Sequence, residues 1–274
     1  ANPVKVASIR GLGAEIVVWP ETARPLALEE WLSRPETRAM PEVQALAVET
    51  KAEYVVGVEY YRNERSGRQD LYNAARIVHA DGKLDPAWSA KTYLVPFVEG
   101  IPFEPVLGYV LAGRGGDMRW LAGGFSRGRG VEPLPAGRVK VGTRICYEEL
   151  YFVLARKLRN AGSDFVAILT NDAWFGRTWF QAYQANTVRL RAIENRCSFV
   201  RVANTGISGF VDPLGRYEGW TALDTQAVEV RDVAIVRGKS LYGRIGDVTA
   251  WLAIAALAFG ASAAWRADRR CLHR

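Results

Sequence analysis

An uncharged run of 18 residues near the C-terminus limits what this chain can fold into. Residues 248–265 read VTAWLAIAALAFGASAAW, and a helix of about this length crosses the ~30 Å hydrocarbon core of a bilayer. Arg244 and Asp247 precede the run, arginines follow it, and Trp251 and Trp265 lie where interfacial aromatic residues are typical. The run predicts one transmembrane helix, and a buried C-terminal core helix is the alternative.

The charges around this run also predict an orientation. Arginine enrichment after the run places the C-terminal tail in the cytoplasm and the preceding domain outside. The first residues contain no apolar run behind a basic start, so they contain no signal peptide that would export residues 1–240. We therefore expect the chain to be a piece of something longer, or to meet a membrane partner encoded elsewhere.

Composition narrows the chemistry that the chain can perform. A length of 274 residues suits one large α/β domain or two small ones. The net charge of +7 is compatible with nucleic acid or an anionic membrane, but no nucleic-acid signature or concentrated Lys/Arg run supports the first. Two histidines leave little material for a Ser-His-Asp triad or a histidine-rich metal site, and three scattered cysteines form no disulfide framework. We expect neither a metal nor a cofactor.

The first 240 residues alternate short β-rich runs with helical stretches, which indicates α/β layering. The expected strands are 4–9, 15–19, 54–60, 74–79, 138–145, 165–170, 199–203 and 210–212. The expected helices are 29–50 (with interruptions at two prolines), 150–161 and 181–196. Residues 63–70 predict a hairpin turn, and the glycine-rich stretch 100–130 predicts a mobile loop.

Three polar residues stand beside β-rich runs: Glu21 after EIVVWP, Lys91 before TYLVPF, and Cys146 after RVKVGTRI. In α/β folds, residues just past the carboxyl ends of strands converge on one rim, where active sites lie. Cys146 also precedes a predicted helix, whose N-terminus favours a reactive thiolate. Taken singly, the cysteine is more simply a small buried apolar residue, and each charged residue a solvated surface group.

Taken together, these segments resemble a known family. VVWPETARP, AKTYLVPFVEGIPF and RICYEELYF resemble the three signature segments of the nitrilase superfamily, in the form found in apolipoprotein N-acyltransferases. NDAWFGRT, RLRAIENR, ANTGISGFVDPLG and SLYGRIGD are similar to the same family, so the resemblance runs from about Val4 to Trp265. It implies a four-layer α-β-β-α sandwich with one C-terminal transmembrane helix. The catalytic domain would span 1–240, and the helix with its basic tail 241–274.

The resemblance also implies an activity and a set of site residues. Glu21 would be the general base, Lys91 the oxyanion stabiliser and Cys146 the nucleophile. Further positions that the acyltransferases need are matched by Glu99, Tyr147 and Glu148. The implied reaction moves a fatty acyl chain from a phospholipid to the N-terminal amine of a diacylglyceryl-lipoprotein, through a thioester, at the outer or periplasmic face of a bacterial inner membrane. Aromatic residues expected at a lipid-facing mouth, with core packing as the alternative for each, are Trp120, Phe125, Trp174, Phe175, Trp179 and Phe180.

Departures from the family pattern leave other functions open. Only about five residues join the first two predicted strands, too few for a crossover between parallel neighbours. The first helix of the family is therefore expected to be missing, so the first strand pairs differently or a patch of sheet is uncovered. Ala90 replaces a usual aspartate, while Val98 and Gly100 replace a usual glycine and tyrosine around Glu99. The alternatives are a nitrilase-type amidase, which Glu148 disfavours, and a catalytically dead membrane-attached remnant that binds lipid or a partner.

Overall fold

Two six-stranded sheets form the centre of the computed structural model, which describes residues 4–7, 13–23, 40–63, 69–103 and 124–272. The first sheet runs in the order β12 (Val230–Val233), β1 (Val4–Ala7), β2 (Ile16–Val18), β3 (Glu53–Asn63), β4 (Gln69–Val78), β5 (Leu84–Ala90). The second runs β11 (Tyr217–Glu218), β10 (Gly209–Val211), β9 (Ser198–Ala203), β8 (Phe165–Thr170), β7 (Val139–Ile145), β6 (Leu134–Ala136).

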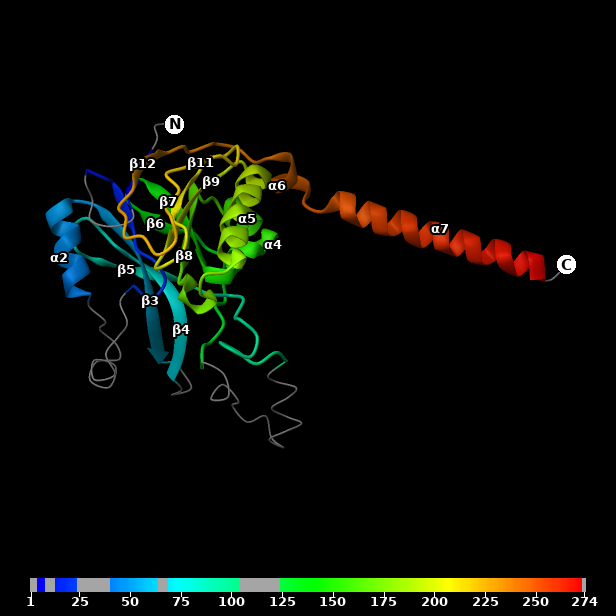
Figure 1. The fold of residues 1–274 in the computed structure, drawn as a ribbon, viewed down its shortest axis with the longest axis horizontal. Helices are drawn as coiled ribbons and strands as arrows, with labels where there is room; N and C mark the ends of the chain where they lie inside the picture. The colour runs from blue at the N-terminus through cyan, green and yellow to red at the C-terminus, as the bar shows by residue number, and fades with distance from the viewer. Residues whose placement is uncertain (1–3, 8–12, 24–39, 64–68, 104–123, 273–274) are drawn as a thin grey trace.

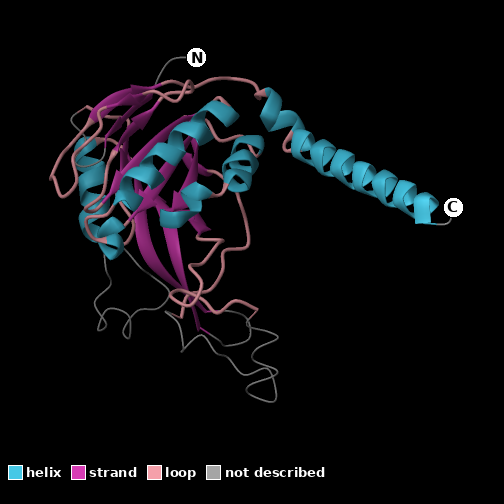
Figure 2. Ribbon diagram, turned by 45° about the vertical axis from the view of Figure 1, so that its right-hand side comes forward, coloured by secondary structure: helices cyan, strands magenta, loops and turns pink. Residues whose placement is uncertain are grey.

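Helices cover the outer faces of this pair of sheets (Figures 1 and 2). The first sheet carries α2 (Pro41–Thr50), whose proline sits in the first turn, where no backbone N–H is required. The second sheet carries α4 (Phe152–Asn160) and α5 (Trp179–Asn195). The predicted α-β-β-α sandwich is confirmed.

Three apolar layers hold the sandwich together. The central layer lies between the sheets and includes Val18 and Val55 facing Phe165 and Leu169, all of them buried. One outer layer packs α2 against the first sheet, and the other packs α4 and α5 against the second. Strand β8 pairs in parallel with both of its neighbours and is covered on both faces, so Phe165–Thr170 are all buried. This explains why its first five residues are apolar without a break.

The parallel strands of the second sheet bring two chain segments side by side. Strands β7 and β8 pair in parallel with Ile145 opposite Leu169. Strand β7 ends at this pair and β8 ends one residue later, so Cys146 and Thr170 are neighbours at the same end of the sheet. The sequence interpretation placed Cys146 directly before a helix, but a five-residue 3₁₀ turn, η2 (Cys146–Leu150), comes between β7 and α4.

The sequence patterns missed part of the first sheet and the edges of both. Strand β5 was not predicted, because its sequence LDPAWSA contains a proline and no clear alternation. The short edge strands β6, β11 and β12 were also missed. Strand β1 lies parallel to β2, with Val6 opposite Ile16. The alternative that the first strand pairs differently is therefore wrong. The absence of a covering helix between them stays a prediction, because residues 8–12 lie outside the described part. Residues 24–39 and 104–123 of the expected helix and loop lie outside it too.

The C-terminal apolar run forms one long helix that projects from the body (Figure 1). After the short α6 (Leu241–Ile245), helix α7 spans Val248–Leu272. Its segment Val248–Trp265 has a mean hydropathy of 1.7 and is 0% buried in the structure. The alternative of a buried core helix is therefore wrong. In the described residues, this is the one helix long and apolar enough to cross a membrane.

Candidate active site

Lys91 is a buried cation held between two carboxylates. It follows β5 directly and is 1% exposed. Its Nζ donates a hydrogen bond to Glu99 Oε1 at 2.7 Å and lies 3.9 Å from Glu21 Oε1. Burial by itself lowers the pKa of Lys91, but the charges of Cys146, Glu21 and Glu99 more than offset this and raise it. The amine therefore stays protonated.

Glu21 lies just beyond the end of β2 and is held by polar groups from other elements. Asn73 Nδ2 donates to Glu21 Oε1 at 2.6 Å, and the Asn171 N–H donates to Oε2 at 2.7 Å. Burial raises the pKa of the Glu21 carboxyl above its ordinary value, against the lowering effects of Lys91 and these hydrogen bonds. A carboxyl with a raised pKa is better matched to taking and returning a proton near neutral pH.

The position of Glu21 depends on a glycine in the neighbouring strand. Gly57 lies in the middle of β3, where a β-carbon would collide with the carbonyl oxygen of Pro20. The same β-carbon would stand 2.8 Å from the Cα of Glu21. The absence of a side chain at this position thus lets the loop that carries the glutamate lie against the strand.

Cys146 occupies a sharp turn at the end of β7, with a φ of 53° that is unusual for a residue with a side chain. Its thiol is buried, and burial followed by the Glu21 charge raises its pKa to about 12. The Lys91 charge, the Thr170 hydroxyl and the Tyr147 N–H act in the opposite direction. The expectation that a helix N-terminus lowers this pKa is wrong, because a short 3₁₀ turn follows and desolvation outweighs it.

The predicted supporting residues Glu99, Tyr147 and Glu148 lie around the three predicted catalytic residues. Glu99 accepts the Lys91 hydrogen bond and, through Oε2, the N–H of Val95 at 2.9 Å. The hydroxyl of Tyr147 lies 2.5 Å from the hydroxyl of Tyr151, and the backbone N–H of Tyr147 acts to lower the pKa of the Cys146 thiol. The structure therefore brings the predicted residues together in one cluster at one end of the sheets.

Glu148 joins the loop that follows β5 to the turn of the cysteine. Its Oε1 accepts the N–H groups of Thr92 at 2.7 Å and Tyr93 at 3.0 Å, while Oε2 accepts the N–H of Ile145 at 3.2 Å. The carboxylate is 1% exposed. It therefore fixes the distance between the segments that carry Lys91 and Cys146, since one rigid group bonds to both.

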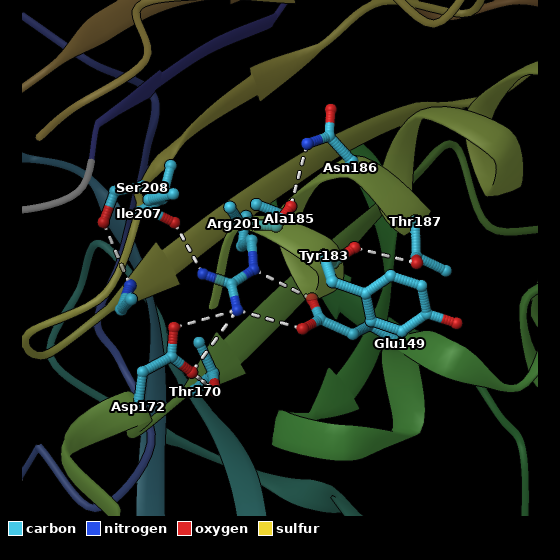
Figure 3. A network of polar contacts seen from close by, with 12 residues as sticks. Glu149, Thr170, Asp172, Tyr183, Ala185, Asn186, Thr187, Arg201, Ile207 and Ser208 are labelled. Carbon is cyan, nitrogen blue, oxygen red and sulfur yellow. Dashed lines mark hydrogen bonds and ion pairs between the residues drawn. The ribbon is translucent and has the colours of Figure 1, made fainter. Parts of the chain in front are cut away.

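A second buried polar network is centred on Arg201, and sequence reasoning missed it (Figure 3). Arg201 on β9 donates to both oxygens of Glu149 at 2.9 Å, to Asp172 Oδ2 at 3.0 Å and to the carbonyl of Ile207 at 2.6 Å. Thr170 donates to Asp172 Oδ1 at 2.7 Å. A lone arginine inside the apolar strand SFVRVA was the available signal, because a charge there requires partners.

The aromatic residues expected at a lipid-facing mouth divide into two groups. Trp174 and Trp179 are 81% and 74% exposed, so core packing does not explain them. Phe175 and Phe180 are half-buried and pack on each other, with ring centroids 4.8 Å apart, and Phe125 is half-buried. Trp120 lies outside the described residues. Among the described side chains, no group of three or more His, Cys, Asp or Glu is placed to hold a metal.

Residues 4–235 match the model of the family described as carbon-nitrogen hydrolase. The chain belongs to the carbon-nitrogen hydrolase family. A solved structure of a carbon-nitrogen hydrolase superfamily protein from Xanthomonas campestris shares the fold, with a TM-score of 0.59 at 17% identity over 85% of this chain and 91% of that one. The predicted fold class of a carbon-nitrogen hydrolase is thus supported by sequence and by structure.

Curated relatives of this chain point to one branch of the family. The apolipoprotein N-acyltransferase of Geobacter metallireducens is 34% identical over 264 residues, which are 95% of this chain and 47% of that protein. The apolipoprotein N-acyltransferase of Rhizobium rhizogenes is 34% identical over 212 residues, 75% of this chain and 37% of that protein. The predicted resemblance is confirmed, and the chain spans less than half the length of these two relatives.

Proposed function

We propose that this chain transfers a fatty acyl group from a phospholipid to the N-terminal amine of a diacylglyceryl-lipoprotein, through a thioester on Cys146. The observation that supports it best is the cluster of Lys91, Glu21 and Glu99, with the amine 2.7 and 3.9 Å from the two carboxylates. That cluster adjoins a buried thiol whose pKa responds to the charges of Lys91 and Glu21. The relatives named apolipoprotein N-acyltransferase suggest which reaction of the family such a cluster performs.

The first half of the reaction forms the thioester. Glu21 takes the proton of the Cys146 thiol as its sulfur attacks the ester carbonyl of the lipid. A thiol with a pKa of about 12 ionises little near neutral pH, so a base beside it is required. The protonated Lys91 and the N–H of Tyr147 stabilise the oxyanion, a contribution of roughly 3–4 kcal/mol per donor. Glu21 then gives its proton to the leaving alcohol.

The second half moves the acyl group to the amine. The lipoprotein amine attacks the thioester carbonyl, Glu21 accepts a proton from it, and Cys146 leaves as the thiolate and is reprotonated. A transferase must keep water away until the amine arrives. The exposed Trp174 and Trp179 support a mouth that faces lipid, since large aromatic side chains favour the membrane interface.

The proposal also covers where the chain is located in the cell. Helix α7 would anchor the catalytic body to the bacterial inner membrane, with the body on the periplasmic or outer face. The charge pattern around residues 248–265 supports that side, because arginines follow the apolar run. The lipid and the lipoprotein would be the partners, and nucleic acid would not be one.

Intact-mass analysis of the purified full chain tests this function. Given phospholipid, the protein should accumulate an acyl adduct on Cys146 that is stable over many minutes. A diacylglyceryl-cysteine peptide should then discharge the adduct and become N-acylated. Cys146→Ala should abolish both events, Lys91→Ala should slow the first, and Cys197→Ala should leave both unchanged. Cys197 is the matched control because it is an equally buried free cysteine that packs with α4 and α5.

Two results would replace the proposal by its rivals. Rapid decay of the adduct to free fatty acid, with no effect of the peptide, would indicate a hydrolase of the amidase type. No adduct on a folded protein would indicate the catalytically dead remnant.

A further inference from the structure

The site contains a hydroxyl group that the mechanism above does not use. Thr170 is the last residue of β8, is fully buried, and leaves the sheet edge beside Cys146 because Ile145 and Leu169 are paired in the parallel register. The parallel register places it next to Cys146, and its hydroxyl acts to lower the pKa of the Cys146 thiol. It also donates to Asp172 Oδ1 at 2.7 Å, so its single proton is already committed when the thiol is neutral.

The aspartate that holds this proton is itself fixed in place. Asp172 Oδ2 accepts a hydrogen bond from Arg201 Nη2 at 3.0 Å, and both side chains are fully buried (Figure 3). Arg201 is in turn bound by both oxygens of Glu149. A β-carbon at Gly206 would collide with the Asp172 carboxylate, so the packing leaves this carboxylate little room to move.

We propose that Thr170 is a positioning residue for Cys146, and that the Arg201–Asp172 pair sets the direction of its hydroxyl. In the resting state the hydroxyl donates to Asp172 and accepts the S–H of the cysteine, which holds the sulfur in one orientation. When Glu21 removes the thiol proton, the hydroxyl rotates and donates to the thiolate. Asp172 keeps the Arg201 hydrogen bond throughout, so the rotation leaves no buried carboxylate without a partner.

No covalent bond changes at Thr170 in this scheme. The thiol proton goes to Glu21, and the threonine proton only turns from one acceptor to the other. The groups that shift the pKa of the thiol are Glu21, Lys91 and the Tyr147 N–H, besides Thr170. The other charges of the turn point elsewhere, since Glu148 accepts backbone N–H groups and Glu149 pairs with Arg201. Thr170 is thus the neutral group that can respond to the ionisation of the thiol.

This inference rests on the proposed role of Cys146 as nucleophile, but its test needs no lipid. The rate of alkylation of Cys146 by iodoacetamide would be followed against pH on the full chain in mild detergent, with the modified peptide identified by mass spectrometry. Thr170→Val removes the hydroxyl and keeps the shape, and it should slow alkylation roughly tenfold at each pH below the thiol pKa, since a hydrogen bond to a charged group is lost. Thr170→Ser should restore the rate to within about twofold of the unaltered chain.

Thr143→Val is the matched control, because Thr143 is an equally buried β-branched residue on the adjacent strand β7 whose hydroxyl has no hydrogen-bond partner among the described residues. It should leave the alkylation rate unchanged. An unaltered rate in Thr170→Val, an equal loss in Thr143→Val, or failure of Thr170→Ser to restore the rate would overturn the proposal. If Thr170→Val and a second variant, Thr170→Ala, both fail to fold, the role is structural and the proposal is wrong.

The alkylation assay and the acyl-adduct assay fail separately. Loss of alkylation in Thr170→Val without any acyl adduct in the unaltered chain would leave this inference intact and remove the transferase function. Full acyl transfer by Thr170→Val would leave the transferase function intact and remove this inference.

Discussion

Replacing Arg201 with methionine is expected to destabilise the protein strongly, because two buried carboxylates would lose their counter-charge. The side chains of Arg201, Glu149 and Asp172 are each 0% exposed. Removing one partner of a buried ion pair typically costs ~3–5 kcal/mol, and this arginine serves two such pairs. We expect the free energy of unfolding to fall by ~5 kcal/mol or more, a large part of the ~5–15 kcal/mol that is typical of a domain.

The loss should depend on pH in a defined direction. Burial raises the pKa of Glu149, and Arg201 opposes that rise, so without the arginine the pKa should go higher still. A carboxyl group with a folded pKa above its unfolded value of 4.5 contributes stability below that value, and this is lost as pH rises through the folded pKa. Arg201→Met should therefore be most damaging near neutral pH and less so as pH falls towards 4.5.

Urea denaturation of the full chain in mild detergent, followed by tryptophan fluorescence at about pH 5 and about pH 8, measures both effects. Arg216→Met is the matched control, since Arg216 is 70% exposed and its pair with Asp212 should contribute less than ~1 kcal/mol. A triple variant, Arg201→Met with Glu149→Gln and Asp172→Asn, should recover much of the loss because the unpaired charges are gone. A urea midpoint for Arg201→Met equal to that of Arg216→Met, at both pH values, would refute the reasoning.

Three further predictions follow from other parts of the structure. Gly57→Ala should lower the rate of Cys146 acylation by roughly tenfold or more, because the new β-carbon collides with the Pro20 carbonyl and displaces Glu21. Gly130→Ala is the control, since a β-carbon there meets nothing within 4 Å and should leave the rate unchanged. Equal acylation rates for the two variants would contradict this prediction. Burial tends to lower the pKa of His79, but its hydrogen bonds to Glu53 and Asp85, at 2.7 and 2.8 Å, raise it above 6.5. The unaltered chain should thus be more stable than His79→Gln by the largest amount below pH 6.5, and this difference should shrink as pH rises through the pKa of His79 in the folded protein. Thermal melts that give the same difference at all pH values would contradict this prediction. Finally, the full chain should stay with membranes in an alkaline carbonate wash through helix α7, and its release would show that α7 does not span the bilayer.

The local pattern of the sequence was enough to predict the central strands and the long apolar helix. Residues 165–169 are apolar without a break, which is typical of a strand covered on both faces, and the structure buries all of them. Residues 248–265 are uncharged, and they form a helix that no part of the body covers. The weaker strand β5 was missed because Asp85 and Pro86 interrupt its pattern, although Lys91 depends on it for its position.

Residue types and family resemblance selected Glu21, Lys91 and Cys146 from the sequence, because each stands where a strand ends. Sequence could not show that burial of the Cys146 thiol outweighs any helix effect, since desolvation depends on what the whole fold packs around the sulfur. Nor could it pair Arg201 with Glu149 and Asp172, which lie 52 and 29 positions away along the chain. The apolar pattern of a strand and the length of an apolar run are local properties that the sequence determines by itself. The partners of a buried charge are set by which strands become neighbours, and only the tertiary structure decides that.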